Sequence, residues 1–292
     1  MDASLSVNSK ETYRIGLLVF DAFRNEYNYN VIWPPVITHV TTFVAYLSLK
    51  MRAYRTVNCY LSAINFRCKS MGHPGFSQNF IVQKMLEGLK RLNKPGDTRL
   101  PITEELLFRI IDKLPNICSS TFETHLFSSA FSLAYYGFFR VGELVLSKKW
   151  QAHQVVAIHN VTFAPQGGKE IIRIIVPFSK TDQYGQGATI EIAETGSKIC
   201  PVFLLKNYLG QRPNVKGPLY CHFGGSYVTR YQFSCVLRKV FKYIGINNSA
   251  SFRTHSFRIG AASSHFEKGT SEEEIKRLGR WKSNAYKSYI RS

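Results

Sequence analysis

The sequence lacks any segment that would place it in or across a membrane. No apolar run reaches the roughly 18 residues that a transmembrane helix needs. The first residues, MDASLSVNSKETYRIG, have neither the basic start nor the apolar core of a signal peptide. We therefore expect no membrane-spanning helix and an intracellular protein.

Cysteine patterns that form disulfide frameworks or zinc sites are also lacking. The six cysteines are scattered along the chain without a CxxC pair. Such spacing is poor for zinc and gives no small disulfide scaffold, so it favours free thiols in a reducing compartment. The sequence therefore predicts no structural metal site.

Acidic residues are scarce, and this shortage is the strongest signal in the composition. The 292 residues include 38 Lys and Arg against 19 Asp and Glu, which gives a formal net charge of +19. An excess of this size repels itself and usually reflects a polyanionic partner. Nucleic acid is the first candidate, and an anionic membrane surface is the second. The 45% hydrophobic and 14% aromatic content is ample for packed cores and excludes a disordered chain.

Residues 1–94 are predicted to form a helical bundle with one basic side. No acidic residue occurs in positions 27–86, where apolar residues recur at helical spacing. Basic residues occupy the ends and outer faces of these helices: Lys50, Arg52, Arg55, Arg67 and Lys69. A solvated basic surface is the alternative, but acidic residues normally intersperse on such a surface. We interpret this side as a nucleic-acid contact.

Proline and glycine at positions 95–101 break the helical pattern and predict a linker to a second domain, residues 102–292. That domain begins with helices, including the almost wholly apolar HLFSSAFSLAYYGFF. Three short segments of period two follow, and they predict an antiparallel meander. Helices then return, and the final one is expected to span residues 271–292. The predicted fold class is mainly α with a small antiparallel β-sheet.

Two tyrosines near the end of the chain, Tyr286 and Tyr289, lie among basic residues. A phenol has a resting pKa of about 10, so it reacts only where its surroundings activate it. If a tyrosine attacks a phosphodiester, cations must neutralise the phosphate oxygens and an acid must protonate the leaving oxygen. Arginine suits the first task because its fork of donors matches two phosphate oxygens.

Arg140 follows a buried aromatic segment, where a cation must be paired or bind an anion. Glu143 lies three residues further on and is the expected partner. A purely structural Arg140–Glu143 ion pair is the alternative interpretation.

The remaining candidates are weaker when each is taken alone. His255 and Arg258 share one helical face in THSFRIG, but this spacing is common and often structural. Lys180 lies in a turn, where lysine is usually solvated. Trp281 is typical of a core position, although its indole N–H can donate to phosphate.

Taken together and in this order, these residues resemble the tyrosine recombinases, the phage-integrase family. The resemblance covers roughly residues 102–292, and residues 1–94 resemble that family's core-DNA-binding domain. The segments HSFRIGAAS, GRWKSNAYKSYIR and SKTDQ especially resemble those of recombinases from eukaryotic mobile elements, the DIRS-type retrotransposons and Cryptons.

The resemblance implies a role for each candidate. Arg140 and Arg258 would hold the scissile phosphate, with Glu143 supporting Arg140. Lys180 would protonate the 5′ oxygen, and His255 would assist proton transfer and phosphate binding. Trp281 would fill a position held by His or Trp, and Tyr289 would attack, because Tyr286 comes too early in the motif. Neither a metal nor ATP would be needed.

The resemblance also implies partners and a setting. We expect double-stranded DNA clamped between two domains, protomers that form dimers on paired half-sites and tetramers in synapsis, and residence in the nucleus, or otherwise the cytoplasm. In the family, a C-terminal segment commonly docks on a neighbouring protomer. Only three residues follow Tyr289, so either the chain is truncated or its protomers assemble differently.

Two other functions fit the same sequence. The first is a DNA-binding protein without chemistry, derived from a mobile element. The complete candidate set argues against it, because binding alone needs no nucleophile. The second is an enzyme like a type IB topoisomerase, which relaxes DNA without exchange between two sites.

Overall fold

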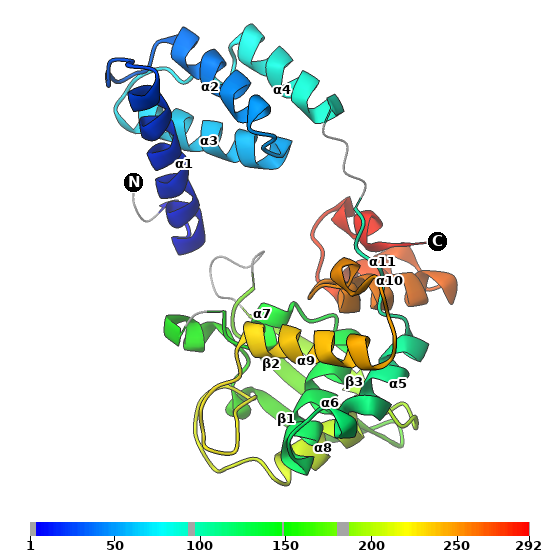
Figure 1. The fold of residues 1–292 in the computed structure, drawn as a ribbon. Coiled ribbons are helices and arrows are strands. Elements are labelled where there is room, and N and C mark those ends of the chain that lie inside the picture. The colour runs from blue at the N-terminus through cyan, green and yellow to red at the C-terminus, as the bar shows by residue number, and fades with distance from the viewer. Residues whose placement is uncertain (1–3, 93–96, 148, 180–186, 292) are drawn as a thin grey trace. The chain divides into compact units, whose positions relative to one another are not determined.

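The chain is mainly helical and carries one small antiparallel sheet, as its sequence predicts (Figure 1). The computed structural model describes residues 4–92, 97–147, 149–179 and 187–291. Contacts divide the chain into two compact units, Met1–Asp97 and Thr98–Ser292. Lys180, the expected proton donor, lies outside the described residues. Within those residues, no helix combines the length and apolarity needed to cross a membrane.

The first unit is a helical bundle around an aromatic core. Its helices are α1 (Val7–Glu26), α2 (Ile37–Leu49), α3 (Tyr54–Ser70) and α4 (Phe80–Leu92). α1 packs along α3, and α2 packs along α4. The rings of Phe20, Phe23 and Phe43 contact one another inside the bundle, with the centroids of Phe20 and Phe43 5.0 Å apart. This core leaves the polar faces of the helices in solvent.

The basic residues predicted for DNA contact lie around the end of α2 and along α3. Lys50, Arg52, Arg55 and Lys69 are exposed. Arg67 is half-buried, and its guanidinium carbon lies 4.3 Å from the centroid of the Trp33 ring. These side chains are therefore available to an anionic partner, with Arg67 the most constrained of them.

The second unit combines helices with the small sheet. In chain order its helices are α5 (Glu104–Lys113), α6 (Thr121–Tyr136), α7 (Val141–Leu144), α8 (Pro201–Leu209), α9 (Arg230–Tyr243), α10 (Ser256–Glu267) and α11 (Glu272–Gly279). Short 3-10 turns also occur: η2 (Leu114–Asn116), η3 (Lys149–Gln154), η4 (Ile158–Asn160), η5 (Ser249–Ser251) and η6 (Asn284–Tyr289).

The sheet is the antiparallel meander that the period-two segments predict. Strands β1 (Val161–Gln166), β2 (Lys169–Val176) and β3 (Ala188–Ala193) pair in the order β1-β2-β3. Arg173 faces Thr162 on one side and Glu191 on the other. Two glycines with positive φ angles, Gly167 and Gly168, make the tight connection between β1 and β2.

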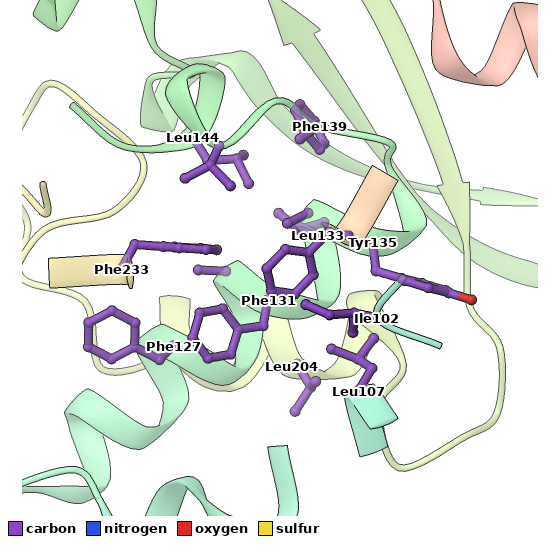
Figure 2. Packing of buried hydrophobic residues seen from close by; sticks show 14 of the residues in the cluster. Ile102, Leu107, Phe127, Phe131, Leu133, Tyr135, Phe139, Leu144, Leu204 and Phe233 are labelled. Carbon is purple, nitrogen blue, oxygen red and sulfur yellow. The ribbon is translucent and has the colours of Figure 1, made fainter. Parts of the chain in front are cut away.

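Helix α6 forms the centre of this unit, as its apolar sequence requires. It is buried from Leu126 to Tyr135, and it packs against α5, α8 and α10. Figure 2 shows Phe127, Phe131, Leu133 and Tyr135 of α6 among residues of the surrounding elements. α6 ends at Tyr136 with Gly137 as its C-cap, and Phe138 then takes a left-handed conformation with φ 49°. This turn redirects the chain into α7.

The single final helix predicted for residues 271–292 is wrong. α11 ends at Gly279, and Arg280 adopts a left-handed conformation with φ 56°. A Cβ on Gly279 would lie 1.7 Å from Cζ3 of Trp281, so the glycine allows the indole to fold back against the end of α11. Residues 284–289 then form the separate turn η6. Trp281 therefore lies in the connection between α11 and η6 and does not begin a helix.

Candidate active site

The turn from α6 into α7 brings Arg140 and Glu143 together. Arg140 precedes α7 and Glu143 lies within it, so the carboxylate reaches back to its neighbour. Oε2 of Glu143 accepts from the backbone N–H of Arg140 at 2.9 Å, and Oε1 accepts from Nη1 at 3.1 Å. The side chain of Glu143 is 5% exposed, whereas that of Arg140 is 19% exposed. Arg140 is thus held on one side and accessible on the other.

Glu143 has a second cationic partner, Arg280. Nη2 of Arg280 donates to Oε2 of Glu143 at 2.8 Å and to the carbonyl of Phe138 at 3.2 Å. Burial is the largest single effect on the Glu143 carboxyl and acts to raise its pKa, but Arg280 and then Arg140 outweigh it. The net result is a pKa below the usual range, so Glu143 is ionised at neutral pH.

Arg258 is fully buried in α10 and contacts the same turn. Its Nη1 donates to the carbonyl of Phe138, and Nη2 donates to the carbonyl of Gly279 at 2.8 Å. Its guanidinium carbon lies 4.5 Å from the centroid of the Trp281 ring and 5.6 Å from that of Tyr289. Burial, together with Arg140 and Arg280, lowers the pKa of Arg258 from its ordinary value.

His255 immediately precedes α10 and is surrounded by positive charge. Its ring centroid lies 6.3 Å from that of Tyr289. Burial first, and then the charges of Arg99, Arg258, Arg230 and Arg140, together lower the pKa of His255 to about 4. At neutral pH the imidazole is therefore neutral.

The two tyrosines of η6 have different surroundings. Tyr289 is half-buried, and its ring centroid lies 5.1 Å from that of Trp281 and 6.0 Å from the guanidinium carbon of Arg99. Tyr286 is fully buried. Burial first, and then the carboxylate of Glu272, raise the pKa of Tyr286 to about 12. Tyr289 is therefore the tyrosine that shares the arginine cluster and remains partly open to solvent.

A hydroxyl on α10 ties down the chain around Tyr289. Oγ of Ser263 accepts from the backbone N–H of Arg291 at 2.8 Å and lies 3.5 Å from the carbonyl oxygen of Tyr289, to which it donates. Ser263 is 5% exposed. The backbone after the tyrosine is thus fixed to the helix that carries Arg258.

The structure brings together Arg140, Glu143, His255, Arg258, Trp281 and Tyr289, whereas Lys180 lies outside the described residues. Three further arginines lie in the same cluster, and the sequence pattern does not predict them: Arg99, Arg230 and Arg280. Arg230 donates to Oγ1 of Thr254 at 2.8 Å, next to His255. Their only signal in the sequence is the general excess of basic residues, which does not single out individual positions.

Positive charge exceeds negative charge throughout this cluster. Among the described residues, the guanidinium groups of Arg140 and Arg280 share the carboxylate of Glu143, and Arg258 lies within the electrostatic influence of all three. An uncompensated group of buried or half-buried cations favours an anionic ligand, and guanidinium forks match phosphate oxygens. Among the residues that the structure describes, no group of three or more His, Cys, Asp or Glu side chains is placed to hold a metal ion.

Solved structures with the same architecture include several recombinases. The XerH site-specific recombinase bound to its difH substrate in a pre-cleavage complex superposes with a TM-score of 0.65 at 14% identity, covering 96% of this chain and 76% of that one. The Tn1549 transposon integrase in complex with circular intermediate DNA gives 0.62 at 12% identity, covering 99% and 91%. The fold is that of the tyrosine recombinases.

A third solved structure adds another integrase to the comparison. A lambda integrase dimer bound to a COC′ core site (residues 75–356) superposes with a TM-score of 0.62 at 16% identity, covering 98% of this chain and 89% of that one. Both units of the chain therefore have counterparts in the tyrosine-recombinase fold. No protein-family model and no curated protein sequence matches the chain.

Proposed function

We propose that this protein is a site-specific DNA recombinase that cleaves and rejoins strands through Tyr289. The observation that carries the proposal is the half-buried Tyr289 ring next to the guanidinium of Arg258, in a cluster where arginines outnumber carboxylates. Such a cluster binds a phosphodiester and stabilises the charge that develops during attack. The solved recombinases with this fold, which are bound to DNA, support the same substrate.

In the proposed reaction, Oη of Tyr289 forms a bond to phosphorus while the bond from phosphorus to the 5′ oxygen breaks. Arg140 and Arg258 hold the non-bridging oxygens, and removing one such donor typically costs about 10²–10³-fold in rate. His255 is neutral at pH 7 and takes up the phenol proton. Lys180, as the resemblance implies, gives a proton to the leaving 5′ oxygen. The products are a 3′-phosphotyrosyl link and a 5′ hydroxyl.

The reverse reaction against a different 5′ hydroxyl rejoins the DNA. The covalent link retains the energy of the broken bond, so this cycle requires no ATP. We further infer that the two units clamp a duplex, with the basic residues around α2 and α3 contacting phosphates of the backbone. The proposal also includes an assembly and a setting. The protein forms dimers on paired half-sites and tetramers in synapsis, acts in a DIRS-type or Crypton element, and resides in the nucleus.

Covalent trapping tests this proposal directly. Full-length protein is incubated with a pool of nicked duplexes whose short 3′ fragment diffuses away after cleavage, in EDTA, and is then denatured in SDS. The Tyr289→Phe variant should form no protein–DNA adduct. The Tyr286→Phe variant is the matched control, because it removes one buried hydroxyl three residues away. Sequencing the linked strands identifies the site.

Each outcome distinguishes between the possible functions. An adduct that requires Tyr289 and survives Tyr286→Phe supports the proposal. An adduct that requires Tyr286 contradicts it. Tight DNA binding with no adduct at any sequence favours a DNA-binding protein without chemistry. Relaxation of supercoiled plasmid without exchange between two sites favours activity like that of a type IB topoisomerase.

A further inference from the structure

Arg280 lies at the junction of the candidate site, although the predicted set of catalytic residues does not include it. It contacts the carboxylate of Glu143 and the carbonyl of Phe138 through the same nitrogen, Nη2. Glu143 also holds Arg140, and the Phe138 carbonyl also holds Arg258. Arg280 thus shares one acceptor with each of the two arginines that are proposed to bind the phosphate.

We propose that Arg280 is a positioning residue that sets the orientation and the charge of Arg140 and Arg258. This inference rests on the proposed function. Its side chain is 13% exposed, and its Nε and Nη1 are buried without a hydrogen-bond partner in the described part of the chain. The Nη2 of Arg280 is engaged by the Glu143 carboxylate and the Phe138 carbonyl, so we assign Arg280 an action through the two arginines that share these acceptors.

The charge distribution explains why a second cation on Glu143 matters. A single carboxylate balances one guanidinium, and here two guanidinium groups share it. Because the Glu143 carboxylate is shared with Arg280, it balances the positive charge of Arg140 only in part. The result is a net positive charge on Arg140, on the side of its guanidinium that remains accessible.

The backbone at Arg280 indicates that this contact is built into the fold. Arg280 occupies the left-handed region at φ 56°, which few residues other than glycine adopt. The same turn presents the Gly279 carbonyl to Arg258 and places Trp281 over the Arg258 guanidinium. The side chain and the backbone of this one turn therefore both act on the arginine pair.

The experiment compares Arg280→Gln with Arg277→Gln, in the full-length protein, on the site recovered by trapping. Arg277 is the matched control, because it lies in α11 three residues before Arg280 but is exposed and pairs with Glu274. We measure the single-turnover rate of adduct formation at saturating protein, the affinity for the same duplex, and the thermal unfolding of each variant. Arg280→Gln should slow adduct formation by about 100-fold, the scale of a small misplacement of reacting groups, and change affinity by less than about threefold.

A second substrate separates positioning from general damage to the fold. A neutral methylphosphonate at the scissile position carries no charge for the arginines to neutralise. If Arg280 acts through the charge on Arg140 and Arg258, the rate difference between Arg280→Gln and wild type should shrink on this substrate by about tenfold or more. Arg280→Lys should restore part of the rate, because a single ammonium reaches only some of the acceptors.

The outcomes separate this inference from the proposed function. If the wild type forms no adduct, the proposed function fails and this inference fails with it. If the wild type forms an adduct and Arg280→Gln matches Arg277→Gln, only the positioning role is overturned. An equal loss on both substrates, with a lowered unfolding temperature, also overturns it and assigns Arg280 to stability alone.

Discussion

Removing the charge of Glu143 should destabilise the second unit more than a typical carboxylate substitution does. In Glu143→Gln the shape of the side chain is kept, but the half-buried guanidinium groups of Arg140 and Arg280 lose their buried counter-charge. Breaking a buried ion pair by removing one partner costs about 3–5 kcal/mol, because the remaining charge stays buried. Each kcal/mol shifts the unfolding temperature of a domain of this size by about 2–4 °C, so we expect a decrease of about 6–20 °C.

Glu191→Gln is the control for this prediction. Glu191 pairs with Arg173 at 2.8 Å on the sheet, but both side chains are nearly half exposed. Such a surface pair contributes about 0–1 kcal/mol. Calorimetry of the wild type and both variants at neutral pH provides the measurement. If Glu143→Gln unfolds within 2 °C of Glu191→Gln, Glu143 does not neutralise a buried cluster.

The pH dependence provides a second check on the same reasoning. The pKa of Glu143 is lower in the folded protein than in the unfolded chain. Its stabilising contribution is therefore fully present above the unfolded pKa, and it is lost as the pH falls through the folded pKa. The difference in stability between the wild type and Glu143→Gln should accordingly narrow in acid. If the difference in unfolding free energy between the wild type and Glu143→Gln stays constant down to the folded pKa, the pKa of Glu143 is not lowered by folding.

Three further predictions concern other parts of the molecule. Gly279→Ala should abolish adduct formation, because a Cβ there meets the ring of Trp281 at 1.7 Å. Gly269→Ala is the stability control, because Gly269 has a positive φ of its own but has open space around it. Equal activity of the two variants would contradict the prediction. His255 has a pKa lowered to about 4, so its contribution to stability is fully present above about pH 6.5 and is lost as the pH falls towards 4. Urea titrations at a series of pH values should show the free energy of unfolding falling more steeply with acid for the wild type than for His255→Gln. Parallel plots of this free energy against pH would refute the prediction. Arg55→Gln should lower the slope of log affinity for DNA against log salt by roughly 0.9 if it contacts one phosphate, whereas Arg14→Gln, whose guanidinium pairs with Glu11 at 2.9 Å, should leave the slope unchanged.

Local patterns in the sequence predicted the parts of the fold that depend on local interactions. The three strands follow from alternation of apolar residues, and the Arg140–Glu143 contact joins residues only three apart. The second partner of Glu143 was not predictable in this way, because Arg280 lies 137 residues away and reaches it only through tertiary packing. The order of the candidate residues pointed to one site, but not to the arginines that complete it.

The final segment shows how a local signal can mislead. The acidic first turn and the apolar spacing of residues 271–279 are typical of a helix, and nothing in the sequence marks Arg280 as its end. A left-handed conformation at a residue other than glycine is uncommon, and here it is held by contacts to Glu143 and Phe138. Gly279, which would normally mark the helix end itself, instead makes room for the Trp281 ring.

The 3-10 geometry of η6 makes the spacing of its tyrosines a structural constraint. A 3-10 turn has about three residues per turn, so side chains three apart lie on the same side of the segment. Tyr286 and Tyr289 both flank the Trp281 ring, with centroids 6.4 Å and 5.1 Å from it. Inserting one residue between them would rotate Tyr289 by about 120° away from Arg258 while leaving its chemistry intact. The length of this segment therefore constrains redesign as strictly as the identity of the tyrosine does.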